Sequence, residues 1–155
     1  SLLIMVCNII VIITTYFLKM KKVLFLCTGN SARSIMSECL LNQLGKGKYK
    51  AFSAGSNPTG KVNLNSLKIL KENNILCENA KSKSWDIFKK ENFNYIVTVC
   101  NNAANETCPI YNVDSIKIHW DIEDPAAIKD EKLIEEKFKY VFNILKKKIK
   151  EEFLS

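Results

Sequence analysis

The chain has few of the residues that build metal centres and cross-linked secreted scaffolds. It contains a single histidine and no two cysteines close enough in sequence to form a zinc pattern, which argues against a zinc site. It has no internal repeat and no low-complexity tract. No run of basic residues is interleaved with aromatic residues, so binding to nucleic acid is not expected.

The composition that remains is typical of one globular domain. Hydrophobic residues make up 47% and charged residues 25% of the 155 residues, which is enough for a substantial core. The net charge of +7 suits an anionic ligand, although many lysines lie near the C-terminus, where they can simply solvate a helix. Six cysteines are present, but Cys27 and Cys100 each end an apolar stretch, unlike the cysteines of a secreted disulfide framework. We therefore expect thiol chemistry in a reducing compartment.

The N-terminal segment is an apolar run over residues 2–18, followed by Lys19, Lys21 and Lys22. Its length is at the short end for a bilayer span, and the lysines would keep the rest of the chain in the cytoplasm. Residues 1–19 are a membrane anchor, an additional packed element, or an over-extended reading frame, since Met20 directly precedes the first predicted strand. We predict that residues 20–155 form a single cytoplasmic domain.

Strands and helices are predicted to alternate along this domain. Strands are predicted over residues 22–27, 49–54, 95–100 and 115–120, and helices over residues 34–44, 63–73 and 131–152, with a short helix after Ser84. The alternation predicts a three-layer α/β fold in which a four-stranded parallel sheet is flanked by helices. Ligands of such sheets bind beyond the carboxyl ends of the strands, where Cys27 and Cys100 both fall.

The segment over residues 23–37, VLFLCTGNSARSIMS, organises the predicted site. Cys27 ends a buried strand, and five residues later Arg33 and Ser34 open a helix. The backbone N–H groups of such a loop, together with the helix N-terminus, can cradle a tetrahedral oxyanion, and the Arg33 guanidinium can bind two of its oxygens. Gly29 and Asn30 are residue types that tolerate a positive φ. We expect the same field to lower the pKa of Cys27, with Ser34 donating a hydrogen bond to the thiolate.

Cys100 and Cys108 form the second thiol pair, separated by the polar segment NNAANET. Free cysteines are usually small buried apolar residues, and that interpretation competes with a reactive one. If the segment is helical, a disulfide between the two requires it to unwind, because eight helical residues rise about 12 Å. We therefore predict a redox-linked refolding of residues 101–107. Three sulfur atoms would then form a relay from Cys27 through Cys100 to Cys108, which can reduce arsenate but not phosphate.

The remaining candidates carry weaker signals. Asp124, in HWDIEDPA, is either a general acid held over the loop by Pro125 or part of a simple surface turn. His119 and Trp120 are expected to be packing residues, because His119 has no evident Asp or Ser partner. Three further cysteines have no motif around them and are expected to be apolar filler: Cys7, Cys39 and Cys77.

Taken together, VLFLCTGNSARSIMSE, FSAGS, VTVCNNAANETCP and HWDIEDPA resemble the thioredoxin-coupled arsenate reductases, which share the fold of low-molecular-weight protein tyrosine phosphatases. The resemblance implies that Cys27 is the nucleophile, that Asp124 is the acid, and that Cys100 and Cys108 are the relay thiols. It also implies that Ser34 supports the thiolate and that the oxyanion is bound by the loop residues Thr28, Gly29, Asn30, Ser31, Ala32, Arg33 and Ser34. Some members hold a monovalent cation such as potassium near the loop, and the matching positions here are Asn30, Glu38, Ser84 and Asp86. The interval between the two relay cysteines is one residue longer than is usual in these relatives.

The resemblance implies an arsenate reductase with reduced thioredoxin as electron donor and no tightly bound cofactor. Phosphate or sulfate would compete with arsenate, and the enzyme is expected to be a monomer that contacts a membrane only through residues 1–19. One alternative is a tyrosine phosphatase that works through a Cys27 phospho-enzyme, although such phosphatases usually have Tyr after Asp-Pro, where Ala126 stands here. A non-catalytic oxyanion-binding module is the third hypothesis.

Overall fold

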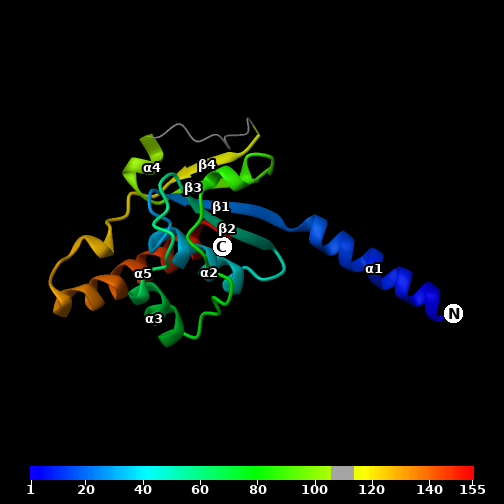
Figure 1. The fold of residues 1–155 in the computed structure, drawn as a ribbon. Helices are drawn as coiled ribbons and strands as arrows, with labels where there is room; N and C mark the ends of the chain where they lie inside the picture. The colour runs from blue at the N-terminus through cyan, green and yellow to red at the C-terminus, as the bar shows by residue number, and fades with distance from the viewer. Residues whose placement is uncertain (106–113) are drawn as a thin grey trace.

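The computed structural model describes residues 1–105 and 114–155, apart from the side chains of residues 17 and 18. Its centre is a four-stranded parallel sheet in the order β2-β1-β3-β4 (Figure 1). The strands are β1 (Lys21–Cys27), β2 (Tyr49–Gly55), β3 (Tyr95–Thr98) and β4 (Ile116–His119). The predicted α/β fold class is therefore confirmed.

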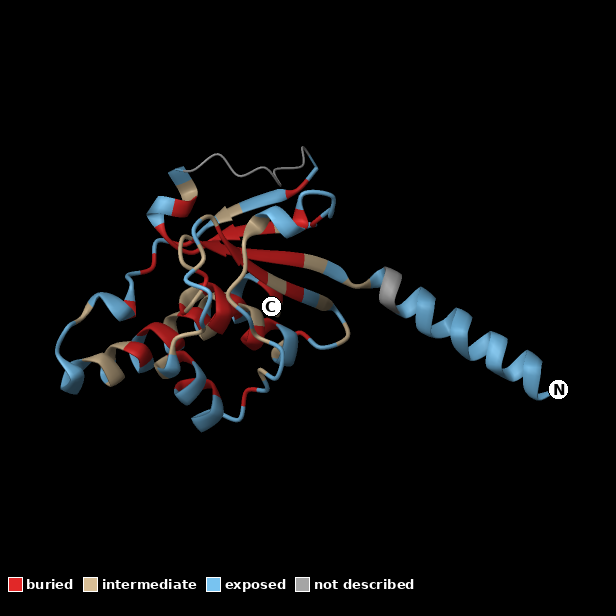
Figure 2. Ribbon diagram, in the orientation of Figure 1, coloured by how far each residue is buried: buried red, intermediate tan, exposed pale blue. Residues whose placement is uncertain are grey.

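The inner strand β1 is buried from Val23 onward, and its residues alternate between two cores. Val23, Phe25 and Cys27 lie in the larger core, to which α2 (Arg33–Leu44) and α5 (Glu131–Phe153) contribute most of the helical residues. Leu24 and Leu26 belong to the smaller core on the opposite face. Figure 2 shows the buried strands between these layers. Successive side chains of a strand point to opposite faces of the sheet. Because both faces are covered here, every residue in this part of β1 has to be apolar.

The shorter elements lie close to their predicted positions. α3 (Leu64–Glu72) begins after Asn63, whose side chain accepts a hydrogen bond from the Asn65 amide, as an N-cap should. Two short 3-10 helices follow, η1 (Trp85–Phe88) and η2 (Pro125–Ala127), with α4 (Asn101–Asn105) between them. Phe88 of η1 packs in the smaller core with Phe93, which closes the second face of the sheet.

The carboxyl ends of β1 and β3 meet at one edge of the sheet. Leu26 pairs with Thr98, and the Val99 amide donates a hydrogen bond to the Leu26 carbonyl at 2.9 Å. Cys27 and Cys100 therefore leave adjacent strands side by side, as the parallel topology predicts.

The N-terminal segment forms α1 (Leu2–Lys19), which projects away from the rest of the molecule (Figures 1 and 2). Its residues from Leu2 to Tyr16 are exposed, so the segment does not pack as an additional element of the core. Near its end, the Tyr16 hydroxyl lies so close to Gly47 that a Cβ at that glycine would collide with it. Among the described residues, no helix combines the length and apolarity needed to cross a bilayer.

Candidate active site

The loop after β1 turns its carbonyl groups outward, as an anion-binding loop should. The carbonyls of Thr28, Gly29 and Ser31 accept hydrogen bonds from the amides of residues 57, 59 and 63, which lie outside the loop. Because the N–H of a peptide points opposite to its C=O, the loop amides face the inner side. α2 begins directly afterwards and has no side-chain N-cap, so its N-terminal dipole adds to this positive field. The arrangement is suited to a tetrahedral oxyanion.

Asn30 and Ser34 hold the Cys27 sulfur at the base of this loop. The Asn30 backbone has φ 45°, the left-handed conformation expected of it, and its amide donates to Cys27 Sγ at 3.1 Å. Asn30 Nδ2 donates to the Ser34 hydroxyl oxygen at 2.8 Å, which leaves the hydroxyl proton for Cys27 Sγ, 2.9 Å away. Gly29 does not use the positive φ that its residue type tolerates; a Cβ there would lie 3.3 Å from Thr59, so the glycine allows a close approach instead.

Cys27 is more deeply buried than its sequence context indicates, with only 3% of its surface exposed. Burial raises the pKa of the Cys27 thiol above its ordinary value, because the charged thiolate loses solvation. Hydrogen bonds from Ser34 and Asn30 and the charge of Arg33 lower the pKa but do not outweigh burial. The prediction of a lowered pKa is therefore wrong for this structure, because burial outweighs the loop contacts that favour the thiolate.

Arg33 links the loop to the segment that carries Asp124. One of its nitrogens donates to the Ile122 carbonyl at 2.8 Å, and the other lies 3.6 Å from the Asp124 carboxylate. The Asp124 side chain also accepts a hydrogen bond from the Ala126 amide at 3.1 Å and so caps η2, where Pro125 occupies the first turn. Asp124 remains half exposed, with its carboxylate beside the guanidinium. The carboxyl group thus lies at the cleft beside the Arg33 guanidinium, and its role as an acid remains a prediction.

Cys100 lines a cleft next to the loop. Its sulfur is 3.7 Å from the Thr28 hydroxyl and accepts a hydrogen bond from the Ala103 amide of α4. The cleft has a volume of about 640 Å³, and its lining includes Thr28, Arg33, Cys100 and Asp124. With Gly29, five of the residues singled out in the sequence therefore line one cleft. Cys108 and residues 106 and 107 of the predicted refolding segment lie outside the described residues.

His119 has partners that sequence reasoning missed. Its Nδ1 lies 2.8 Å from the Thr98 hydroxyl, and its Nε2 lies 2.9 Å from the Asn101 side-chain oxygen. His119 and Thr98 are paired across β3 and β4, and Asn101 follows Cys100 directly. The histidine thus ties the start of α4 to the sheet. The only available signal was that Thr98 and His119 both fall within predicted strands, near their carboxyl ends.

Three of the four expected cation ligands have protein partners of their own. Asn30 belongs to the loop and Glu38 to α2, whereas the Ser84 hydroxyl caps η1 and the exposed Asp86 pairs with Lys89. The partner of Glu38 is instead Lys83, with 3.6 Å between the ammonium and the carboxylate. Burial raises the pKa of Glu38, and Lys83 and the Ser53 hydroxyl act in the opposite direction. The four residues remain a prediction as cation ligands, although Ser84 caps a helix and Asp86 is ion-paired with Lys89.

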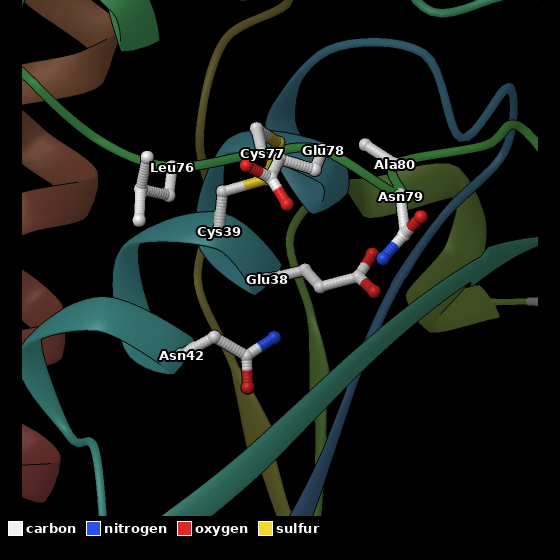
Figure 3. Close-up of a pocket in the computed structure, with 8 residues that line it drawn as sticks. All are labelled: Glu38, Cys39, Asn42, Leu76, Cys77, Glu78, Asn79 and Ala80. Carbon is white, nitrogen blue, oxygen red and sulfur yellow. A yellow bond between two sulfur atoms is a disulfide. The ribbon is translucent and has the colours of Figure 1, made fainter.

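Two of the three cysteines predicted to be apolar filler form a disulfide. Cys39 of α2 and Cys77 are joined, with their Cα atoms 5.5 Å apart, at a pocket of about 230 Å³ that also includes Glu38 (Figure 3). Cys7 is exposed on α1. The prediction of filler is therefore wrong for the exposed Cys7, and it missed the bond between Cys39 and Cys77, which do pack at the larger core. Nothing in the local sequence of Cys39 or Cys77 indicates the pairing, since the two residues are 38 positions apart.

Comparison with known proteins agrees with this geometry. The family described as low molecular weight phosphotyrosine protein phosphatase matches residues 22–154. A curated relative from Bacillus cereus, named arsenate reductase, is 39% identical over 107 residues, which cover 69% of this chain and 78% of the relative. The resemblance stated from the sequence motifs is confirmed.

Solved structures give the same result for the fold. A crystal structure of an arsenate reductase from Archaeoglobus fulgidus is 32% identical, with a TM-score of 0.62 over 82% of this chain and 98% of that one. A thioredoxin-dependent arsenate reductase from Corynebacterium glutamicum is 24% identical, with a TM-score of 0.63 over 85% of this chain and 61% of that one. The chain belongs to the low molecular weight phosphotyrosine protein phosphatase family of enzymes.

Proposed function

We propose that the protein reduces arsenate to arsenite through an adduct on Cys27, followed by a disulfide relay. The curated relatives named arsenate reductase support the choice of substrate. The position of Cys100 carries the proposal, because this second thiol lines the same cleft as Arg33 and Asp124. A phospho-enzyme mechanism has no use for a thiol at that position.

Binding is the first step. The loop amides and the Arg33 guanidinium neutralise a tetrahedral arsenate that is bound with its arsenic above Cys27 Sγ. The Cys27 thiol gives its proton to a bound oxyanion and attacks arsenic, forming an S–As bond. Asp124 protonates the departing oxygen, which leaves as water. Arsenic is still As(V) in this adduct, and no electrons have yet been transferred.

Reduction occurs when Cys100 attacks Cys27 Sγ as a thiolate. A Cys27–Cys100 disulfide forms, the S–As bond breaks, and its electron pair stays on arsenic, which leaves as As(III) arsenite. Cys108 then attacks Cys100 Sγ, forming a Cys100–Cys108 disulfide and releasing Cys27 as a thiolate. A reduced dithiol returns the pair to thiols, and thioredoxin is the dithiol to test first. Such a relay requires a reducing compartment, in keeping with the expected cytoplasmic location.

Phosphatase activity is the second candidate, and the family match favours it specifically. Cys27, Ser34, Arg33 and Asp124 form a site that needs no further thiol to cleave an aryl phosphate. In that reaction a Cys27 phospho-enzyme is hydrolysed by water.

One set of variants separates the two functions. Thioredoxin-dependent arsenate turnover and aryl-phosphate hydrolysis are measured for the wild type and for Cys27→Ser, Cys100→Ser and Cys108→Ser. We expect arsenate turnover to be lost in all three variants and hydrolysis only in Cys27→Ser, with Cys7→Ser as the control that keeps both. Full arsenate turnover in Cys100→Ser would refute the relay.

A further inference from the structure

Lys83 occupies the place beside the loop where a metal cation was expected. Its ammonium lies 3.6 Å from the Glu38 carboxylate, 3.4 Å from the Ser53 hydroxyl and 3.0 Å from the Lys81 carbonyl. Glu38 also accepts a hydrogen bond from Ser53. The Lys83 and Glu38 side chains are only 21% and 16% exposed. A carboxylate, a hydroxyl and a carbonyl are the oxygen ligands that an alkali cation takes, and here they surround an ammonium.

The backbone of the same residue is bound to the catalytic loop. The Lys83 amide donates to Asn30 Oδ1 at 2.8 Å, and the Lys83 carbonyl accepts from the Gly55 amide at 3.0 Å. Asn30 in turn donates to Cys27 Sγ and to Ser34. The ammonium thus fastens the segment around residue 83 to α2 through Glu38 and to β2 through Ser53, while its backbone holds Asn30 in place.

We propose that the Lys83 ammonium is a built-in replacement for a monovalent metal cation, and that it positions the Asn30 side of the loop without any bound metal. An ammonium has the charge of a potassium ion and a similar compact shape, but its tether keeps it in place at any salt composition. The residues around the ammonium do not fit a metal ion. A metal cation bound by the same three oxygens would lie next to the ammonium, and the two positive charges would repel each other. Lys83 is a positioning residue, and this inference does not depend on which reaction Cys27 performs.

The test is thermal unfolding of the full chain in potassium, sodium and choline chloride at equal ionic strength. Wild-type protein is expected to have the same Tm in all three salts. Lys83→Ala removes the cation from a largely buried carboxylate and is expected to lower the Tm in choline by about 5 °C. Potassium is expected to restore part of this loss in Lys83→Ala, because the shortened side chain vacates the space between Glu38 and Ser53.

Lys81→Ala is the matched control, since it removes the same charge from an exposed side chain two residues away. We expect it to show neither the loss nor the potassium response. Affinity for inorganic phosphate, measured in the same salts, is expected to follow the same pattern as the Tm. A potassium-specific rise in the wild-type Tm would overturn the proposal, whether or not Lys83→Ala folds. So would a Lys83→Ala protein that loses stability without any response to potassium.

Discussion

Replacing Cys77 with serine removes the disulfide to Cys39 and opens a covalent loop between residues 38 positions apart. Cross-linking a loop of this length lowers the entropy of the unfolded chain by an amount equivalent to about 4 kcal/mol at 25 °C. For a domain of this size each kcal/mol corresponds to about 2–4 °C in Tm, so the variant is expected to melt about 8–16 °C below the oxidised wild type. The other half of the pair is Cys39, which is 5% exposed and packs in the larger core.

The assay compares melting of the wild type with and without a dithiol reductant. Reduction is expected to lower the Tm of the wild type to that of Cys77→Ser, whose own Tm should not respond to the reductant. Cys7→Ser is the control, because Cys7 is an exposed free thiol on α1 and its loss leaves the disulfide intact. Peptide mapping should identify the Cys39–Cys77 cross-link in the oxidised sample. Equal melting of oxidised and reduced wild type would refute the argument, as would the absence of that cross-linked peptide.

The other predictions concern the loop and its acid. Because burial raises the pKa of Cys27, alkylation by iodoacetamide should still accelerate at pH values where an exposed thiol has levelled off, and Ser34→Ala should move the profile further in the same direction. The folded thiol holds its proton more tightly than the unfolded one, so its contribution to stability is complete below the unfolded pKa and is lost as pH rises through the folded pKa. The alkaline loss of Tm should therefore be smaller in Cys27→Ser. Arg33→Lys should weaken phosphate binding by about tenfold or more, because a lysine cannot bind two oxygens at once, as equilibrium titration would show. Asp124→Asn should lower kcat by about 100-fold or more while phosphate affinity is retained, and an equal loss of both would contradict its role as the acid.

The parts of the site that sequence reasoning placed correctly are those set by local chain geometry. The loop from Cys27 to Arg33 is a contiguous strand–loop–helix segment, and Asn30 takes the left-handed conformation its residue type allows. Asp124 caps the turn that follows it, as an Asp-Pro pair often does. The alternation of strands and helices in the sequence predicted the parallel sheet. In that sheet the carboxyl ends of β1 and β3 are adjacent, which places Cys100 near Cys27.

The parts that sequence reasoning missed depend on contacts between distant residues. Lys83 meets Glu38 across 45 positions, and nothing near either residue marks the other. The Cys39–Cys77 pairing has the same origin. The raised pKa of Cys27 was missed because the field of the loop can be inferred from the sequence, whereas the depth of burial requires the packed structure. In each case the tertiary environment outweighed the local signal.

The transfer of electrons from the Cys27 adduct to Cys100 is tested most directly by trapping its product. Reduced Cys108→Ser protein is mixed with one equivalent of arsenate, quenched with acid, and analysed by intact mass and peptide mapping while arsenite is quantified. The relay predicts one arsenite per protein and a Cys27–Cys100 disulfide in the same amount. Arsenite formation with Cys100 still a free thiol, or no arsenite at all from protein that binds arsenate, would contradict it.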